Sequence, residues 1–250
     1  MSGHSKWSTI KRKKGALDAK RSKIFTKIIK EISVAVRESG PDPDGNPRLR
    51  LAIQSAKAAN MPKENMERAI KKGSGADEAH YIEITYEGYA SHGVAVYVEC
   101  LTDNLNRTVA SVRSAFSKHG GALGTNGSLD FLFDRKGVFV LKQPEALLNE
   151  EAFTFELIDA GAEEVIFEEE YITIYCAMED FGTLQKKVES LALEVETAEL
   201  QRIPKTTVTL DDEALKKVLK LVDVLEDDDD VQKVYHNVEW SQVQMANLEA

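Results

Sequence analysis

Cysteine is scarce in this sequence: Cys100 and Cys176 are the only two among 250 residues, and each lies in a separate apolar run. Two cysteines without a CxxC partner exclude a disulfide framework, so we expect reduced, buried thiols. Long apolar runs are also missing, since none approaches the roughly 18 residues that span a bilayer. The opening segment MSGHSKWSTIKRKKG has no apolar core after its charges, which excludes a secretory signal. We therefore expect a cytoplasmic protein without membrane contact.

Motifs for catalysis, cofactors and metals are absent as well. The five histidines lack HExxH or other ligand spacing, and no GxSxG nucleophile motif occurs. The glycine-rich stretch 120–127 lacks GxGxxG spacing, which favours a flexible loop over a nucleotide cradle. The turn at 42–46 begins like a calcium loop, but Ile53 at its twelfth position cannot supply a carboxylate. We expect no cofactor, no metal ion, no small-molecule substrate and no enzymatic activity. The rival hypothesis, an enzyme with a site in an acidic cleft, lacks a supporting motif.

Positive and negative charges are unevenly distributed along the chain. The net charge is −10, yet residues 1–75 hold 18 lysines and arginines against 7 acids, while residues 76–250 hold 14 against 35. A basic head on an acidic body indicates that the head binds a polyanion. The acidic body repels the same partner, which restricts docking to one face.

Residues 17–39 carry apolar side chains at helical spacing, among them Ile24, Ile28 and Ile32. Four lysines recur on the same predicted helix at intervals of three and four residues, and we call them the lysine stripe: Lys20, Lys23, Lys27 and Lys30. Because a solvated helix face usually mixes both signs, a stripe of one sign favours contact with phosphate groups.

Two further short helices follow the first. Gly40-Pro41 ends the first helix, and Asn46 and Pro47 suit the cap and first position of a second helix that runs to about residue 59. A third helix runs to about residue 72, with Gly73 as its C-cap. Three helices in a row predict a small helical domain whose cations point outward.

Beyond a linker at 74–75, the pattern changes to mixed strands and helices. Residues 81–89 alternate between apolar and polar, 94–101 form a continuous apolar run, and 106–119 are helical. The remaining apolar segments predict strands near 128–133, 138–141, 165–167, 171–176, 195–203, 206–210 and 234–238, and helices near 150–160, 181–191 and 214–225. Without steady β-α alternation, this mixture predicts α+β layers, in which helices cover one face of each sheet.

Two local motifs leave alternatives open. Residues 102–108 lie where a strand ends and a helix begins, with Asn106 as a plausible N-cap. Free N–H groups there, together with Arg107, would suit a phosphate, but a turn that only fixes the fold is favoured. The acidic run at 227–230 is expected to be a solvated loop rather than a metal site, and, if functional, to keep phosphate off that face.

Several long segments resemble the YebC/PmpR family: MSGHSKW at 1–7, AANMPKEN at 58–65, TDNLNRT at 102–108 and GALG at 121–124. The resemblance covers essentially the whole chain. It implies a three-helix domain (1–75), an α+β domain of ferredoxin-like character (76–133 plus 206–240) and a second such domain inserted into it (134–205). It also implies no catalytic residues and no cofactor. Some members are described as regulators that bind promoter DNA, and others, including a mitochondrial translational activator of a cytochrome oxidase subunit, act at the ribosome.

Together, the charge pattern and the resemblance predict a non-enzymatic regulator of gene expression that binds nucleic acid. The partner is duplex DNA or, as the alternative, structured ribosomal RNA, with the ribosome as a further partner. Trp7 could either stack on a base or pack on the domain. The predicted contact residues are Lys6, Trp7, Lys11, Arg12, Lys13, Lys14, Lys20, Arg21, Lys23, Lys27, Lys30 and Arg107.

Overall fold

The computed structural model describes residues 21–75, 80–144, 149–168, 170–241 and 243–244. Its first elements are three helices: α2 (Arg21–Ser39), α3 (Pro47–Ala58) and α4 (Lys63–Gly73). Asn46 connects the first two, because its side chain accepts a hydrogen bond from Leu49 N at 3.0 Å and donates to the carbonyl of Ala35 at 2.7 Å. The predicted cap at Asn46 is therefore confirmed. The apolar faces of the three helices share one core, which includes Ile32, Leu49, Ala52, Met66 and Ala69.

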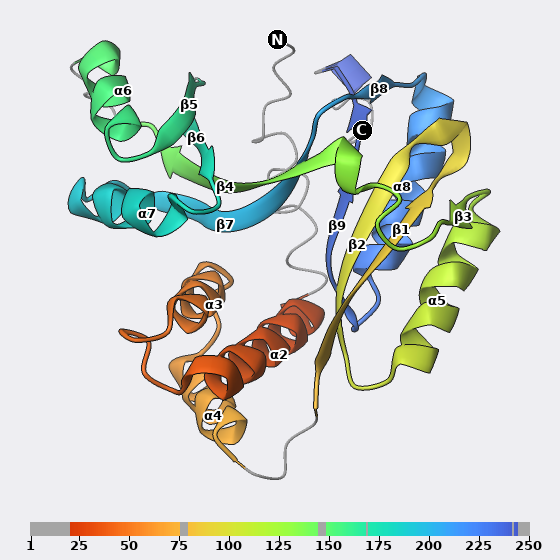
Figure 1. Cartoon of the computed structure of the whole chain (residues 1–250), viewed down its shortest axis with the longest axis horizontal. Coiled ribbons are helices and arrows are strands. Elements are labelled where there is room, and N and C mark those ends of the chain that lie inside the picture. Colours follow the sequence, from red (N-terminus) through yellow and green to blue (C-terminus); the bar gives the residue numbers. More distant parts are fainter. Residues whose placement is uncertain (1–20, 76–79, 145–148, 169, 242, 245–250) are drawn as a thin grey trace. The chain divides into compact units, whose positions relative to one another are not determined.

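A four-stranded sheet with strand order β3-β1-β2-β9 follows in the same compact unit. Its strands are antiparallel where their pairing is described, and β1 and β2 form a hairpin in which Ile82 pairs with Thr102. Helices α5 and α8 cover one face of this sheet (Figure 1). The bounds are β1 (Ile82–Tyr89), β2 (Ala95–Thr102), α5 (Leu105–Lys118), β3 (Ala122–Leu123), α8 (Asp212–Glu226) and β9 (Val231–His236). Two short strands, β8 (Val208–Thr209) and β10 (Val238–Glu239), form a separate parallel pair. In the sequence, β8 precedes α8 and β10 follows β9.

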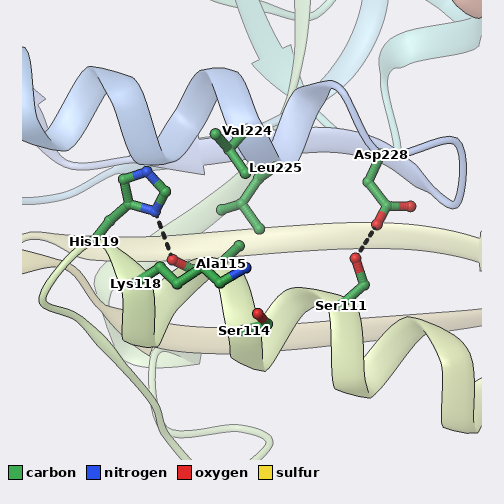
Figure 2. A pocket seen from close by; sticks show the side chains of 8 residues that line it. All are labelled: Ser111, Ser114, Ala115, Lys118, His119, Val224, Leu225 and Asp228. Carbon is green, nitrogen blue, oxygen red and sulfur yellow. Dashed lines mark hydrogen bonds between the residues drawn. The ribbon is translucent and has the colours of Figure 1, made fainter.

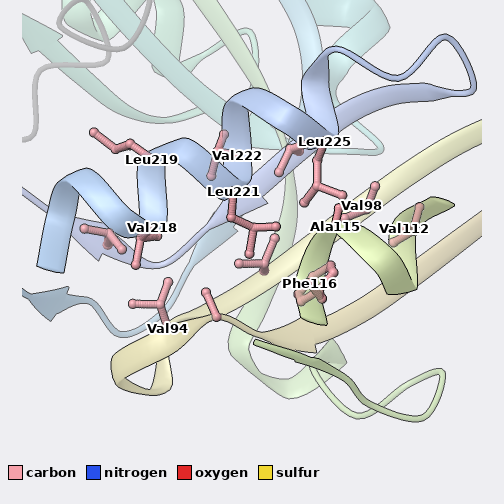
Figure 3. Close-up of a cluster of buried hydrophobic side chains, with 14 of the residues drawn as sticks. Val94, Val98, Val112, Ala115, Phe116, Val218, Leu219, Leu221, Val222 and Leu225 are labelled. Carbon is pink, nitrogen blue, oxygen red and sulfur yellow. The ribbon is translucent and has the colours of Figure 1, made fainter. Parts of the chain in front are cut away.

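The core of this sheet layer is made by alternate strand residues and one stripe from each helix. Figure 3 shows Val98 of β2, Val112 and Phe116 of α5, and Leu221 and Val222 of α8 turned toward one another. All five are buried. Burial of such side chains stabilises a fold by about 1.5–3 kcal/mol each, so this cluster holds the two helices on the sheet.

Residues 134–203 form a second compact unit. Its elements run β-α-β-β-α-β, and its strand order is β5-β6-β4-β7, which is the ferredoxin-like arrangement. The bounds are β4 (Phe133–Lys142), α6 (Glu150–Ile158), β5 (Ala162–Phe167), β6 (Tyr171–Ala177), α7 (Phe181–Ser190) and β7 (Val195–Pro204). The predicted α+β fold class is thus confirmed. The residue limits given above for three domains remain a prediction.

One strand prediction is wrong. Residues 128–132 were expected to begin a strand, but they form a turn and a 3-10 helix (Asp130–Leu132), and β4 begins only at Phe133. The cause is the buried carboxylate of Glu87, which accepts hydrogen bonds from Gly127 N at 2.7 Å and from Leu129 N. These bonds fold the preceding loop back on β1, so that Leu129 becomes buried.

Two other sequence expectations can be compared directly. Cys100 and Cys176 are free and buried, as predicted, and burial raises the pKa of the Cys100 thiol to about 12. Among the helices that the structure describes, none combines the length and apolar content that crossing a membrane requires.

The packing at Gly137 gives a test of the second unit. A Cβ on Gly137 would lie 2.5 Å from Cys176 Sγ and 2.6 Å from a ring carbon of Phe181. We expect Gly137→Ala to lower the free energy of unfolding by about 1–3 kcal/mol, because overpacking forces side chains out of their rotamers. Chemical denaturation measures it.

Gly182→Ala in α7 is the matched control, since nothing lies within 4 Å of its added Cβ. It should leave stability unchanged or raise it by up to about 1 kcal/mol, because alanine favours helix. Equal destabilisation by both variants would contradict this packing.

Candidate nucleic-acid interface

Most of the predicted contact residues cannot be compared with the structure. Seven lie outside the described residues: Lys6, Trp7, Lys11, Arg12, Lys13, Lys14 and Lys20. Arg21 begins α2, but its side chain is not among those described. The four remaining residues are Lys23, Lys27, Lys30 and Arg107. Three of them, Lys23, Lys30 and Arg107, contact the acidic loop, which we define as Asp227–Asp230, and Lys27 contacts Glu226 directly before it.

The three lysines of the stripe that lie in α2, Lys23, Lys27 and Lys30, contact the C-terminal end of α8 and the acidic loop. Lys23 Nζ lies 2.5 Å from Asp227 Oδ2 and 2.9 Å from the Asp227 carbonyl oxygen. Lys27 Nζ donates to the carbonyl of Glu226, the last residue of α8, at 2.6 Å. The last carbonyls of a helix have no intrahelical partner and carry the negative end of the helix dipole. Ammonium groups are therefore well suited to this position.

Lys30 and Arg107 meet at Asp230. Lys30 Nζ lies 2.8 Å from Asp230 Oδ1, and Arg107 Nη2 lies 2.7 Å from Asp230 Oδ2. Arg107 Nε donates to Oδ2 at 3.0 Å and Nη2 donates to Oδ1 at 3.0 Å, which makes the contact bidentate. The hydroxyl of Thr108 donates to the same oxygen at 2.9 Å. One carboxylate thus joins α2, α5 and the start of β9, and we call this group the Asp230 hub.

Burial and charge act in opposite directions on Asp230. Its side chain is only 5% exposed, and burial alone would disfavour the charged form. Hydrogen bonds from Lys30, Arg107 and Thr108 outweigh burial, so the pKa of Asp230 is lowered from its ordinary value of 3.8. The hydrogen bonds that Arg107 donates to the carboxylates of Asp230 and Asp103 raise the pKa of Arg107. Asp230 and Arg107 are therefore both charged at neutral pH.

Three expectations need correction here. Lys30 was predicted to point outward, but it is buried, with 8% of its surface exposed. The acidic run was predicted to be a solvated loop, but Asp230 is buried at 3%. The N-cap of α5 is Asn104, whose side chain accepts from Arg107 N at 3.0 Å, rather than Asn106. The first two errors have the same cause, because opposite charges 200 residues apart in sequence pair with one another in the fold. The third is local, because the helix begins at Leu105, one residue before the predicted cap.

The contacts that the structure describes for Thr102–Thr108 hold the turn between β2 and α5. The Thr102 hydroxyl accepts from Asn104 N at 2.9 Å, and its oxygen lies 2.7 Å from the hydroxyl oxygen of Thr108, beside Asp230. These contacts favour the capped turn over the phosphate site. Arg107 remains a proposed contact residue, since half of its side chain is exposed.

Other cations of the helical domain lie at the surface, and the sequence analysis did not single them out. They are Lys57 of α3 and Lys63, Arg68, Lys71 and Lys72 of α4, all exposed. We call this set the α3–α4 basic face. The sequence signal was available, because Lys63, Arg68, Lys71 and Lys72 occur within ten residues.

A small pocket lies between α5 and α8 (Figure 2). Its volume of about 190 Å³ is below the roughly 300–1,000 Å³ of typical ligand sites. Three of its polar side chains already have partners, since Ser111 Oγ donates to the Asp228 carboxylate and His119 Nδ1 donates to the Ala115 carbonyl at 2.8 Å. Within the part of the chain that is described, no group of three or more His, Cys, Asp or Glu is placed to hold a metal ion.

Comparison of the chain with known protein families identifies its relatives. A family model described as the TACO1/YebC protein N-terminal domain matches residues 5–76, and one described as the TACO1/YebC second and third domain matches residues 81–238. The chain belongs to the TACO1/YebC family. The resemblance to the YebC/PmpR family read from its motifs is thereby confirmed.

Members of the TACO1/YebC family similar to this chain include two proteins named "probable transcriptional regulatory protein". One, from Amoebophilus asiaticus, is 59% identical over 95% of this chain and 98% of its own length. The other, from Geobacillus thermodenitrificans, is 53% identical over 98% of this chain and 99% of its own length. A crystal structure of a conserved hypothetical protein from Aquifex aeolicus matches with a TM-score of 0.79 and 45% identity, covering 90% of this chain and 93% of that one. The names of the two relatives support a regulatory role.

The Asp230 hub gives a pH-dependent stability test. Asp230→Asn should lower the free energy of unfolding by about 3 kcal/mol at neutral pH, because it leaves Lys30 buried without its counter-ion. A carboxyl with a lowered native pKa stabilises above its unfolded pKa and loses that effect as pH falls toward the native value. The difference from the unmodified chain should therefore be constant from about pH 5 to 8 and shrink below about pH 4.

Urea denaturation across this pH range measures the effect. Asp229→Asn is the matched control, because the Asp229 side chain is exposed and only its carbonyl contacts Lys30. A loss in Asp229→Asn as large as that in Asp230→Asn would show that the hub is not the source.

Proposed function

We propose that this chain is a nucleic-acid-binding regulator of gene expression that holds the phosphate backbone of a duplex and performs no catalytic step. The observation that carries the proposal is the charge segregation, with 18 cations against 7 acids in residues 1–75 and the reverse excess beyond them. Affinity for duplexes comes largely from cations that displace counterions condensed on phosphates. The relatives named as probable transcriptional regulatory proteins support the regulatory part of the proposal.

The proposed contact surface has two parts. The first is the N-terminal arm, with its cations Lys6, Lys11, Arg12, Lys13 and Lys14, and with Trp7 as a stacking residue. The second is the helical domain, which offers the α3–α4 basic face at its surface, while Lys23, Lys27 and Lys30 of the stripe contact Glu226–Asp230. The acidic remainder of the chain repels phosphate and so orients the complex.

Contacts to the backbone rather than to base edges are favoured by the positions of the arginines. Base readout in the major groove relies mainly on Arg, Asn and Gln. Arg48 of α3 is held by Glu31 at 2.7 Å and by Glu38 at 2.9 Å, and Arg50 donates to the Pro43 carbonyl at 3.2 Å. These arginines are thus engaged within the helical domain.

This arrangement favours a second candidate beside promoter DNA, namely structured ribosomal RNA bound at the ribosome in support of translation. The major groove of an A-form helix is too narrow for side chains to read, so proteins recognise its shape and backbone. A protein that contacts only phosphates fits such a partner without a recognition helix. A cytoplasmic location remains a prediction under either candidate.

Neutralisation of the arm tests the proposal. Replacement of Lys11, Lys13 and Lys14 by Gln, together with Arg12→Gln, should weaken binding to DNA and RNA duplexes of the same sequence. Each lost phosphate contact lowers the slope of log K against log salt by about 0.9, so the slope should flatten by about 3–4. Fluorescence anisotropy titrations at several salt concentrations measure both quantities.

The matched control removes four exposed cations outside the basic head by changing Lys205, Lys216, Lys217 and Lys220 to Gln. This variant should keep the original salt slope. An unchanged slope in the arm variant would mean that the arm does not contact phosphate.

Crosslinking in cells, followed by sequencing of the bound DNA and RNA, distinguishes the two partner classes. Enrichment of ribosomal RNA supports the translational role, whereas enrichment of promoter DNA supports the transcriptional one. Recovery of neither above a control protein of equal charge would contradict the proposed function.

A further inference from the structure

We propose that the C-terminal end of α8 and the acidic loop imitate a nucleic-acid backbone within the chain, and that they occupy Lys23 and Lys27 of the lysine stripe until a phosphate backbone displaces them. This inference rests on the proposed function and adds an autoinhibitory contact to it. Lys23 and Lys27 would therefore be available only in the complex with the duplex, while Lys30 stays in the Asp230 hub.

The contacts reproduce what a phosphate strand offers. The lysine Nζ atoms meet a row of anionic and carbonyl oxygens, from Asp227, Glu226 and Asp229-Asp230 in turn. Lys23, Lys27 and Lys30 are four and three residues apart, so one helix face meets this row about once per turn. A phosphate strand likewise presents oxygen anions at regular intervals. The two partners therefore compete for the same ammonium groups.

The strength of these contacts changes along α2. At the N-terminal end, the Lys23 and Asp227 side chains are 39% and 46% exposed, whereas at the other end those of Lys30 and Asp230 are 10% and 5% exposed. Exposed ion pairs are weak and screened by salt, while a buried, multiply bonded pair is costly to break. Displacement should thus begin at Lys23, and the Asp230 hub should keep α2 anchored.

The position of Lys23 in the sequence supports this order. It follows directly after the segment 1–20, which carries the cations of the proposed arm. A duplex held by the arm would be at high effective concentration near Lys23, because the second contact becomes intramolecular. The arm would then recruit the duplex, and exchange of Asp227 for phosphate at Lys23 would extend the contact along α2.

The test is a double-mutant cycle on the exposed pair. Asp227→Asn should tighten binding to a labelled RNA duplex and to a DNA duplex of the same sequence, by roughly two- to fivefold, because an exposed pair no longer competes. In the Lys23→Gln background, Asp227→Asn should lose the part of the gain that exceeds general repulsion, since the lysine that benefits is missing. Anisotropy titrations measure all four affinities.

Asp223→Asn is the matched control, because it removes the same charge one turn earlier on α8 at an exposed position. Its affinity should rise less than that of Asp227→Asn, since it tests only general repulsion of the duplex. Equal gains in the two variants, or a gain from Asp227→Asn that persists in full without Lys23, would overturn the inference.

The outcomes also separate this inference from the proposed function. If the unmodified chain binds both duplexes but Asp227→Asn gives no gain, the autoinhibitory contact is wrong and the function stands. If the unmodified chain binds neither duplex, and Asp227→Asn binds neither, both are wrong. Thermal unfolding of each variant checks that the half-exposed Asp227 can be changed without loss of the fold.

Discussion

The rest of the first compact unit depends on the carboxylate of Asp230. It pairs with Lys30 of α2 and Arg107 of α5, while its own carbonyl accepts from Leu101 N of β2 at 2.8 Å. Helices and strands that are far apart in the sequence therefore meet at one charged group. A carboxylate is costly to bury without partners. Its contacts with Lys30, Arg107 and Thr108 must therefore form together. These contacts connect the helical domain to the sheet. They also fix the helix face that carries Lys23, Lys27 and Lys30 against the acidic loop.

Most elements of the fold could be predicted from local patterns. The helical spacing of Ile24, Ile28 and Ile32 identified α2, and Asn46-Pro47 marked the start of α3 within a residue. These predictions succeed because side-chain periodicity and cap chemistry act over a few residues. The turn before β4 was missed, because Glu87 holds Leu129 from 42 residues away. No local pattern contains that contact.

The candidate site was predicted less well for the same reason. The spacing of Lys23, Lys27 and Lys30 correctly placed them on one helix face. It did not indicate which partner that face contacts. Their acidic partners lie about 200 residues later in the sequence. A run of four acids, Asp227–Asp230, at the end of a helix was a usable sign, since it complements a row of lysines of similar length. Taken separately, the lysines indicated contact with phosphate, and the four acids indicated exposure to solvent.

The order of strands in the first sheet has a consequence for synthesis of the chain. Strand β9 (Val231–His236) pairs with β2 (Ala95–Thr102), while residues 134–203 form a unit of their own between them. Domains generally fold as units while the chain emerges from the ribosome, the N-terminal parts first. Here the contiguous middle segment can complete its sheet before the earlier strands receive their last neighbour. The β2 edge of the nascent β1–β2 hairpin thus stays unpaired until residues 231–236 have been translated.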